Sequence, residues 1–192
     1  MTPTSAFSQL VRESAFKLAM DGPKSLGGLF DLTSKRLVRY AVAIARNQHD
    51  AEDAVQSALA KVASEPGRLS KADRPWPYLI QMVRNEVLQA ARKRKRLRYL
   101  SDLRDLLTRC PVDELEQEET HRAVWKALRR LPPPQAEVVV LKIWEDMTFA
   151  EIGEMLTISP DTAASRYRYA TQKLTKLLAT QHFVSREEVL SG

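Results

Sequence analysis

The stretch SPDTAASRYRYA, residues 159–170, combines the start signals of a helix with side chains that can bind nucleic acid. Ser159 is a preferred N-cap residue, Pro160 suits the first helical turn, and Asp161 complements the positive end of the helix dipole. Helical periodicity predicts an inward face of Ala163, Tyr167, Ala170, Leu174 and Leu177. The outward face then holds small residues and two arginines.

That outward face comprises Thr162, Ala164, Ser165, Arg166, Arg168 and Tyr169. Arginine can contact guanine edges or phosphates, and small residues allow the backbone to approach DNA closely. Just upstream, Thr148 and Glu151 have the spacing of a capping box, which predicts a short preceding helix. Two short helices joined by a tight turn predict a helix-turn-helix, with an ordinary helical hairpin as the alternative.

A second candidate nucleic-acid site is the basic run from Arg92 to Arg98. It holds six cations, Arg92, Lys93, Arg94, Lys95, Arg96 and Arg98. Such a density of cations suits binding to phosphates. Each phosphate neutralised on duplex DNA steepens the salt slope, the slope of log K against log salt concentration, by about 0.9. A solvated helix end, where cations complement the dipole, explains the run equally well.

A third candidate is the segment around Trp76, which lies close to Lys71, Arg74 and Arg84. An aromatic ring beside cations can stack an unpaired base, worth about 1–3 kcal/mol. The alternative is that Trp76 is a core residue closing a helix junction. For Tyr78 we favour that core role.

Catalytic and metal-binding patterns are missing from the sequence. It has no phosphate loop, no metalloprotease motif and no nucleophile elbow, so we expect no enzymatic activity and no cofactor. The lone Cys110 and the separated His49, His121 and His182 match no metal spacing. No apolar run approaches the roughly 18 residues of a membrane span. The formal charge of +6 favours a polyanionic partner, nucleic acid first.

Helical periodicity dominates the elements that must position these residues. A short amphipathic helix around Phe7 and Val11 is either packed on the body or frayed, and a helix follows over 29–45. Asp50 is expected to cap the next helix, which ends at 65–67. LSKADRPWP is predicted as a loop, and a long helix begins at Tyr78.

A second helical module follows an acidic segment. QAEVVVLKIWEDM suits a strand by local preference, but the prolines before it favour a helix, which we choose. The predicted fold class is all-α, with two small helical domains joined by an acidic linker and a C-terminal helix-turn-helix. The predicted boundaries are an extension (1–24), a first domain (25–98), the linker (99–118), a second domain (119–180) and a tail (181–192).

The order of these parts resembles the extracytoplasmic-function sigma factors, the two-domain initiation subunits of bacterial RNA polymerase. The resemblance spans roughly residues 25 to 180 and rests on three motifs. They are DAEDAVQ from Asp50, VRNEVLQAARKRKR from Val83, and nearly the whole segment from LRRLPPPQ to the recognition helix. The first motif is short and is weak evidence alone, but the three motifs in this order and at these separations are highly specific to the family.

The resemblance implies three sets of binding residues. The core polymerase would be bound by Asp50, Glu52, Asp53 and Gln56. The minus-ten element would be bound by Lys71, Arg74, Trp76, Arg84, Asn85, Arg92, Lys93, Arg94 and Arg96, with the loop from Lys71 to Pro77 accepting an extruded base. The minus-thirty-five element would be bound by Ser159, Thr162, Ala164, Ser165, Arg166, Arg168 and Tyr169.

Several residues depart from the family pattern. Ser57 stands where Glu is usual, Gln89 where Asp is usual, and Tyr78 where Trp is usual. In the recognition helix, Ala164 and Tyr169 stand where cations are common. These departures leave the expected fold intact, and they mean that individual base contacts cannot be transferred from relatives.

The resemblance implies a cytoplasmic protein that binds core RNA polymerase and promoter DNA, directs promoter recognition and melting, and does not insert into a membrane. It leaves an anti-sigma factor open as a further partner. The main alternative is a stand-alone helix-turn-helix regulator, and another is a sigma-like protein that only sequesters a partner. A nucleic-acid-modifying enzyme ranks far behind, because metal ligands and a base are missing.

Overall fold

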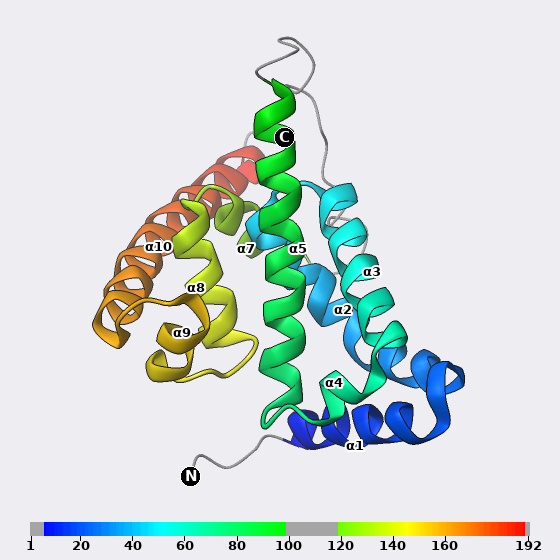
Figure 1. The fold of residues 1–192 in the computed structure, drawn as a ribbon. Helices are drawn as coiled ribbons and strands as arrows, with labels where there is room; N and C mark the ends of the chain where they lie inside the picture. The colour runs from blue at the N-terminus through cyan, green and yellow to red at the C-terminus, as the bar shows by residue number, and fades with distance from the viewer. Residues whose placement is uncertain (1–5, 99–118, 191–192) are drawn as a thin grey trace. The chain divides into compact units, whose positions relative to one another are not determined.

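The computed structural model describes residues 6–98 and 119–190, with the helical backbone alone for 95–98, 119–122 and 180–190. The predicted linker over 99–118 lies outside the described residues. The chain divides into two compact units, one within 1–108 and one within 109–192. Both described parts are helical and contain no strand (Figure 1). The all-α fold class with two helical domains is therefore confirmed.

The first unit is built on three long helices. They are α2 (Leu26–Ala45), α3 (Gln48–Ser64) and α5 (Pro75–Arg98), and each packs against the other two. Their facing sides bury apolar side chains at helical spacing, including Leu37, Tyr40, Val55, Leu59, Leu79 and Val83. The short helix α4 (Pro66–Ser70) connects α3 to α5.

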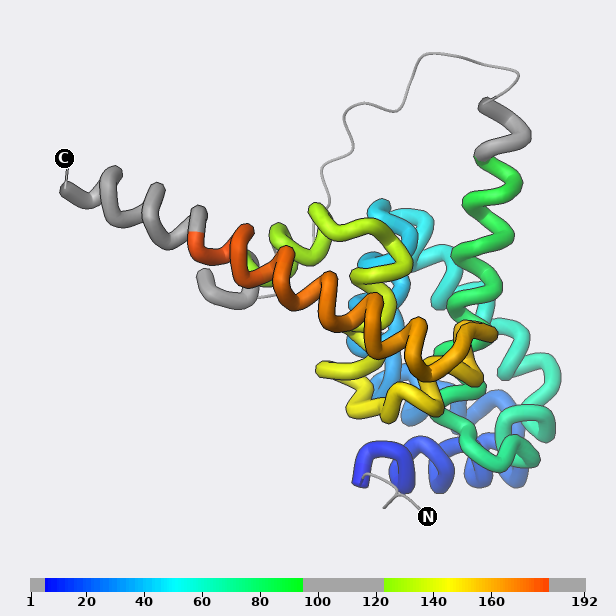
Figure 2. Tube along the Cα trace, turned by 90° about the vertical axis from the view of Figure 1, so that its left-hand side faces the viewer, coloured from blue at the N-terminus to red at the C-terminus, as the bar shows by residue number. Residues whose placement is uncertain are grey.

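The N-terminal segment is a packed helix and not a frayed tail. Helix α1 (Ala6–Asp21) buries Val11, Ala15 and Leu18 completely, and a 3₁₀ turn, η1 (Gly22–Ser25), leads into α2. Helix α1 contacts α2, α4 and α5. Figures 1 and 2 show it, in dark blue, beside α4. This settles the question that the periodicity left open.

The start of α3 differs from the sequence prediction. The N-cap is Asn47, whose side chain accepts a hydrogen bond from the Asp50 amide at 3.1 Å. Asp50 therefore lies inside the first turn, and its prediction as the cap is wrong. Asparagine is an equally good cap, and an acidic residue in the first turn also complements the dipole, so the local signals fit either start.

The long helix α5 begins at Pro75, one turn earlier than predicted. Proline is well tolerated in a first helical turn, because its missing N–H would have no partner there. The predicted loop LSKADRPWP therefore shrinks to residues 71–74, between α4 and α5. This brings Trp76 into the first turn of α5.

The second unit contains α7 (Glu119–Arg129), α8 (Pro133–Ile143), α9 (Phe149–Leu156) and α10 (Pro160–Leu190). Helix α10 contacts the other three. Helix α10 runs past residue 180, the predicted end of the domain. The choice of helix over strand for QAEVVVLKI is confirmed, because α8 buries Val138, Val139 and Val140.

The end of α8 also differs from what its periodicity predicts. Helical spacing puts Val138, Leu141, Ile143 and Trp144 on one side of the helix, but Ile143 is exposed. Trp144 follows the last residue of the helix, and its ring lies 5.3 Å from that of Trp125 in α7.

Candidate nucleic-acid interface

A tight turn joins α9 to α10 as the sequence predicts. The capping box is complete: the Glu151 carboxylate accepts from the Thr148 amide at 2.7 Å, and Thr148 Oγ1 accepts from the Glu151 amide at 3.3 Å. At the other end of α9, Thr157 has a left-handed backbone, with φ of 57°. The Ile158 amide then bonds back to the Gly153 carbonyl at 2.9 Å. These bonds fix both ends of α9.

Gly153 allows the turn to close. A Cβ placed on Gly153 would lie 2.8 Å from the Ile158 carbonyl oxygen and 3.2 Å from the Pro160 nitrogen. Both atoms belong to the backbone of the turn, so a side chain cannot be accommodated by a rotamer change. The sequence reasoning missed this requirement, because a glycine in a short helix has no local signature of close approach.

The first turn of α10 is capped as predicted. Ser159 Oγ accepts from the Thr162 amide at 3.1 Å and lies 2.8 Å from Thr162 Oγ1. Ala163, Ala170 and Leu174 are buried. Tyr167 is half-buried, with its ring 5.6 Å from that of Phe149. The predicted inward face therefore holds, although Tyr167 and Leu177 lie at its edge.

The predicted DNA face of α10 is only partly open. Arg168 and Tyr169 are exposed, and the Arg168 guanidinium carbon lies 5.4 Å from the centre of the Tyr169 ring. This cation–π contact gives the guanidinium a preferred orientation on the surface. Ser159 is also exposed, whereas the other predicted residues, Thr162, Ala164, Ser165 and Arg166, are half-buried.

The basic end of α5 presents exposed Arg92 and Lys93. Arg94 is half-buried and forms an ion pair with Asp50 in the first turn of α3. The sequence had placed these two residues in different sites, Arg94 on DNA and Asp50 on the polymerase. The side chain of Arg96 lies outside the described residues.

The start of α3 presents a small polar surface. Asp53 and Gln56 are exposed, while Glu52 is half-buried and accepts a hydrogen bond from the Gln48 amide group at 2.6 Å. Of the four residues predicted to bind the polymerase, Asp53 and Gln56 are the most accessible.

Trp76 is buried, with 3% of its surface exposed. Its ring meets the Phe7 ring edge-on, with centres 4.9 Å apart and planes at 83°. Of the two roles that the sequence allowed, this packing supports the core residue, because the ring is covered. Lys71 and Arg74 beside it are exposed, and Arg84 is half-buried.

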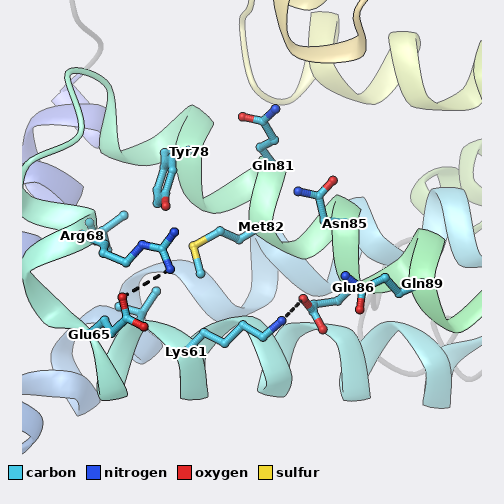
Figure 3. Close-up of a pocket in the computed structure, with 11 residues that line it drawn as sticks. Lys61, Glu65, Arg68, Tyr78, Gln81, Met82, Asn85, Glu86 and Gln89 are labelled. Atoms are coloured by element: carbon cyan, nitrogen blue, oxygen red, sulfur yellow. Dashed lines mark hydrogen bonds and ion pairs between the residues drawn. The ribbon is translucent and has the colours of Figure 1, made fainter.

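A pocket of about 240 Å³ opens between α3, α4 and α5 (Figure 3). Tyr78, expected to be a core residue, is half-buried and lines it together with the predicted Asn85. The residues that sequence reasoning missed are Lys61, Val62, Glu65, Arg68, Leu69, Gln81, Met82, Glu86 and Gln89. Those on α5 recur at helical spacing beside Asn85, which is the signal that could have found them.

The pocket has both charges and flat surfaces. Lys61 Nζ pairs with Glu86 at 2.6 Å, and Arg68 pairs with Glu65 at 3.3 Å. Figure 3 shows the Tyr78 ring and the Arg68 guanidinium pointing toward one another, with Met82 beside the guanidinium. Such a combination can hold a planar polar group, with stacking from the ring and hydrogen bonds from the amides and ions.

Two family models match this chain. The model for sigma-70 region 2 matches residues 29–97, and the model for sigma-70 region 4 matches residues 121–174. The sigma factor SigM of Mycobacterium tuberculosis, described as an ECF RNA polymerase sigma factor, is 33% identical over 151 residues, 78% of this chain and 75% of SigM. The chain belongs to the ECF sigma factors of the sigma-70 family.

A further sequence relative agrees with this assignment, and a solved structure shares the fold. The RNA polymerase sigma factor CarQ of Myxococcus xanthus is 28% identical over 151 residues, 78% of this chain and 87% of CarQ. A solved complex of the sigma factor RpoE with the anti-sigma factor NepR from Bartonella quintana contains a chain with the same fold. Its TM-score is 0.66 at 23% identity, and the match covers 78% of this chain and 94% of that one.

As an ECF sigma factor, the protein acts in transcription initiation, with a region 2 unit containing the pocket and a region 4 unit containing the helix-turn-helix. This family membership decides against the stand-alone regulator. Among the described residues, no cluster of His, Cys, Asp and Glu could hold a metal ion. The described helices also include none with the length and hydropathy needed to cross a membrane.

Proposed function

We propose that this sigma factor divides promoter recognition between its two units. Region 2 binds core polymerase through the exposed start of α3 and holds a base of the opened minus-ten strand in the pocket between α3, α4 and α5. Region 4 reads the minus-thirty-five duplex with the start of α10. The observation that supports this proposal most is the pocket, because it joins a half-exposed ring, Tyr78, to amides and ion pairs at one site.

We place the proposed base site in this pocket and not in the Lys71–Pro77 loop, which the family resemblance implied. Tyr78 offers a face for stacking, and Asn85 and Arg68 offer hydrogen-bonding groups for a base edge. Extrusion of a base costs a few kcal/mol, which stacking and edge contacts can offset. Exposed Lys71, Arg74, Arg92 and Lys93 would neutralise phosphates nearby.

The protein itself performs no reaction in this proposal and acts as a binding factor in the cytoplasm, where polymerase and promoter DNA meet. Reconstitution with core RNA polymerase on a promoter library tests it. We expect transcripts from a subset of promoters that share both elements. Failure to bind core polymerase, or transcription without any shared motif, would contradict the proposal. An anti-sigma factor is a further expected partner, by analogy with the RpoE–NepR complex.

The first prediction concerns the polymerase surface. Replacement of Asp53 and Gln56 together by alanine is expected to weaken binding to core polymerase at least tenfold. Both side chains are exposed at the start of α3, where a partner can reach them. Binding is measured by fluorescence anisotropy with labelled sigma factor. Lys35→Ala, on the exposed side of α2, is the control and should leave the affinity unchanged. Equal affinities for all three proteins would place the docking surface elsewhere.

The second prediction concerns the Arg94–Asp50 ion pair. Both side chains are partly exposed, 37% and 26%, so the pair adds little stability, but it occupies a guanidinium that could contact phosphate. Asp50→Asn should release Arg94 and increase the salt slope of single-stranded DNA binding by the isolated chain by about 0.7.

Asp53→Asn is the matched control, because it removes the same charge from the next exposed turn and leaves the Arg94 pair intact. The gain should also vanish when Asp50→Asn is combined with Arg94→Gln. If Asp53→Asn steepens the slope as much as Asp50→Asn does, net charge alone explains the effect.

The third prediction concerns Ala164, where relatives often carry a cation. Ala164→Lys should strengthen minus-thirty-five binding by the holoenzyme and steepen its salt slope by about 0.9, one phosphate contact. Filter binding at several salt concentrations measures both. An unchanged slope would mean that Ala164 does not face the DNA.

A further inference from the structure

Helix α1 precedes residues 29–97, the part matched by the region 2 model, and lies against the α4–α5 connection. It is anchored by its completely buried residues Val11, Ala15 and Leu18. The dark-blue helix in Figure 1 runs beside α4 and the start of α5. Helix α1 therefore has a fixed place from which it can act on its neighbours.

Two side chains of α1 contact the end of this connection and the first turn of α5. The Arg12 guanidinium donates to the backbone carbonyl of Asp73, within residues 71–74. The Phe7 ring packs against Trp76 at 4.9 Å. The Arg36 guanidinium of α2 lies over both rings, 3.9 Å from the centre of Phe7 and 5.5 Å from that of Trp76.

These contacts hold the segment that separates two walls of the pocket. One wall, on α4, contributes Arg68 and Leu69. The other wall, at the start of α5, contributes Tyr78 and Gln81. The short connection over 71–74 joins these walls along the chain, and α4 also packs against α1, α3 and α5. A shift of the connection would therefore change the distance between Arg68 and Tyr78.

We propose that α1 is a positioning element for the base pocket, with Phe7 and Arg12 as its positioning residues. They touch no base. They hold the α4–α5 connection so that Arg68 and Tyr78 stand at the separation that selects one base over the others. This inference rests on the proposed function of the pocket.

The physical basis is the distance dependence of base readout. A correct edge contact discriminates between bases only while donors and acceptors stay within hydrogen-bonding range. A site held too loosely by its supporting residues loses selectivity before it loses binding. Loss of an α1 contact should therefore reduce selectivity at one promoter position and leave polymerase binding intact.

The test uses holoenzyme reconstituted from the full chain and core polymerase. Open-complex formation is measured on promoters that carry each of the four bases at each position of the minus-ten element. The readout is the ratio between the preferred and the next-best base. Arg12→Ala and Phe7→Ala should lower this ratio about three- to tenfold at one position, as expected for loss of one stabilising contact.

Conservative variants separate positioning from folding. Arg12→Lys keeps a donor for the Asp73 carbonyl, and Phe7→Leu keeps an apolar contact with Trp76, so both should restore most of the ratio. Lys17→Ala, exposed on the same helix, should leave it unchanged. The affinity for core polymerase and the Tm should stay close to the wild-type values in Arg12→Ala.

Two results would overturn the inference. In the first, Tyr78→Ala and Asn85→Ala lower the base ratio but Arg12→Ala and Phe7→Ala do not, so the pocket reads a base without help from α1. In the second, the α1 variants lower the ratio only together with Tm and polymerase affinity, so α1 serves folding alone. If Tyr78→Ala and Asn85→Ala leave every ratio unchanged, the proposed base site itself is wrong and the inference fails with it.

Discussion

Gly153→Ala should abolish minus-thirty-five recognition and leave region 2 folded. The new Cβ would stand 2.8 Å from the Ile158 carbonyl oxygen and 3.2 Å from the Pro160 nitrogen. Relief requires the α9–α10 turn to open, which moves the first turn of α10 and with it Ser159 and Thr162. We expect a cost of about 1–3 kcal/mol from overpacking, a large share of the stability of a small helical unit.

The measurements are thermal unfolding by circular dichroism and footprinting of the holoenzyme on promoter DNA. Protection of the minus-thirty-five element should disappear, while the affinity for core polymerase through region 2 is retained. Gly27→Ala is the matched control: Gly27 lies in α2, and nothing lies within 4 Å of its added Cβ. That change should be neutral or stabilise by up to about 1 kcal/mol. Normal footprints for Gly153→Ala would mean that the turn tolerates a side chain.

The helix-turn-helix could be predicted in detail because its determinants are local. The capping box of Thr148 and Glu151 and the Ser159 cap each join atoms three residues apart. Spacing and residue type alone therefore specify them. The same holds for the fold class, since helical periodicity recurs along the chain. The unpredicted Gly153 contact depends on the close approach of two backbones, which no local pattern encodes.

The region 2 site was less predictable because its contacts join distant parts of the chain. The Arg94–Asp50 and Lys61–Glu86 ion pairs connect α5 to α3, and neither has a signature in the sequence of one helix. The pocket likewise depends on how three helices pack. A family motif identified Asn85, but no pattern in the sequence indicates that Lys61 and Arg68 line the same pocket.

The roles of Trp76 and Tyr78 show how a small boundary error changes an interpretation. With the helix starting at Tyr78, the tryptophan falls in a loop and is available for stacking. With the helix starting at Pro75, Trp76 turns inward against Phe7, and Tyr78 reaches the pocket. Prolines on both sides of Trp76 fit either start, so only tertiary packing decides between them.

Trp76→Ala should therefore destabilise region 2 strongly, by about 3–5 kcal/mol, the cost of removing a large buried aromatic side chain. The change leaves a cavity beside Phe7 and removes the ring under the Arg36 guanidinium. We expect a marked fall in the Tm of the region 2 transition, measured by calorimetry on the full chain, with loss of polymerase binding following from unfolding. Trp76→Phe should recover much of the Tm, because a smaller ring still meets Phe7.

Tyr78→Ala is the informative comparison, because Tyr78 is half-buried and lines the pocket. It should change the Tm much less than Trp76→Ala does, yet slow promoter opening about tenfold, in line with the loss of one base-stacking contact. The two aromatic residues thus separate stability from DNA melting. The opposite pattern, an unchanged Tm with slow opening for Trp76→Ala, would mean that Trp76 leaves its buried position when promoter DNA binds and stacks on the extruded base itself.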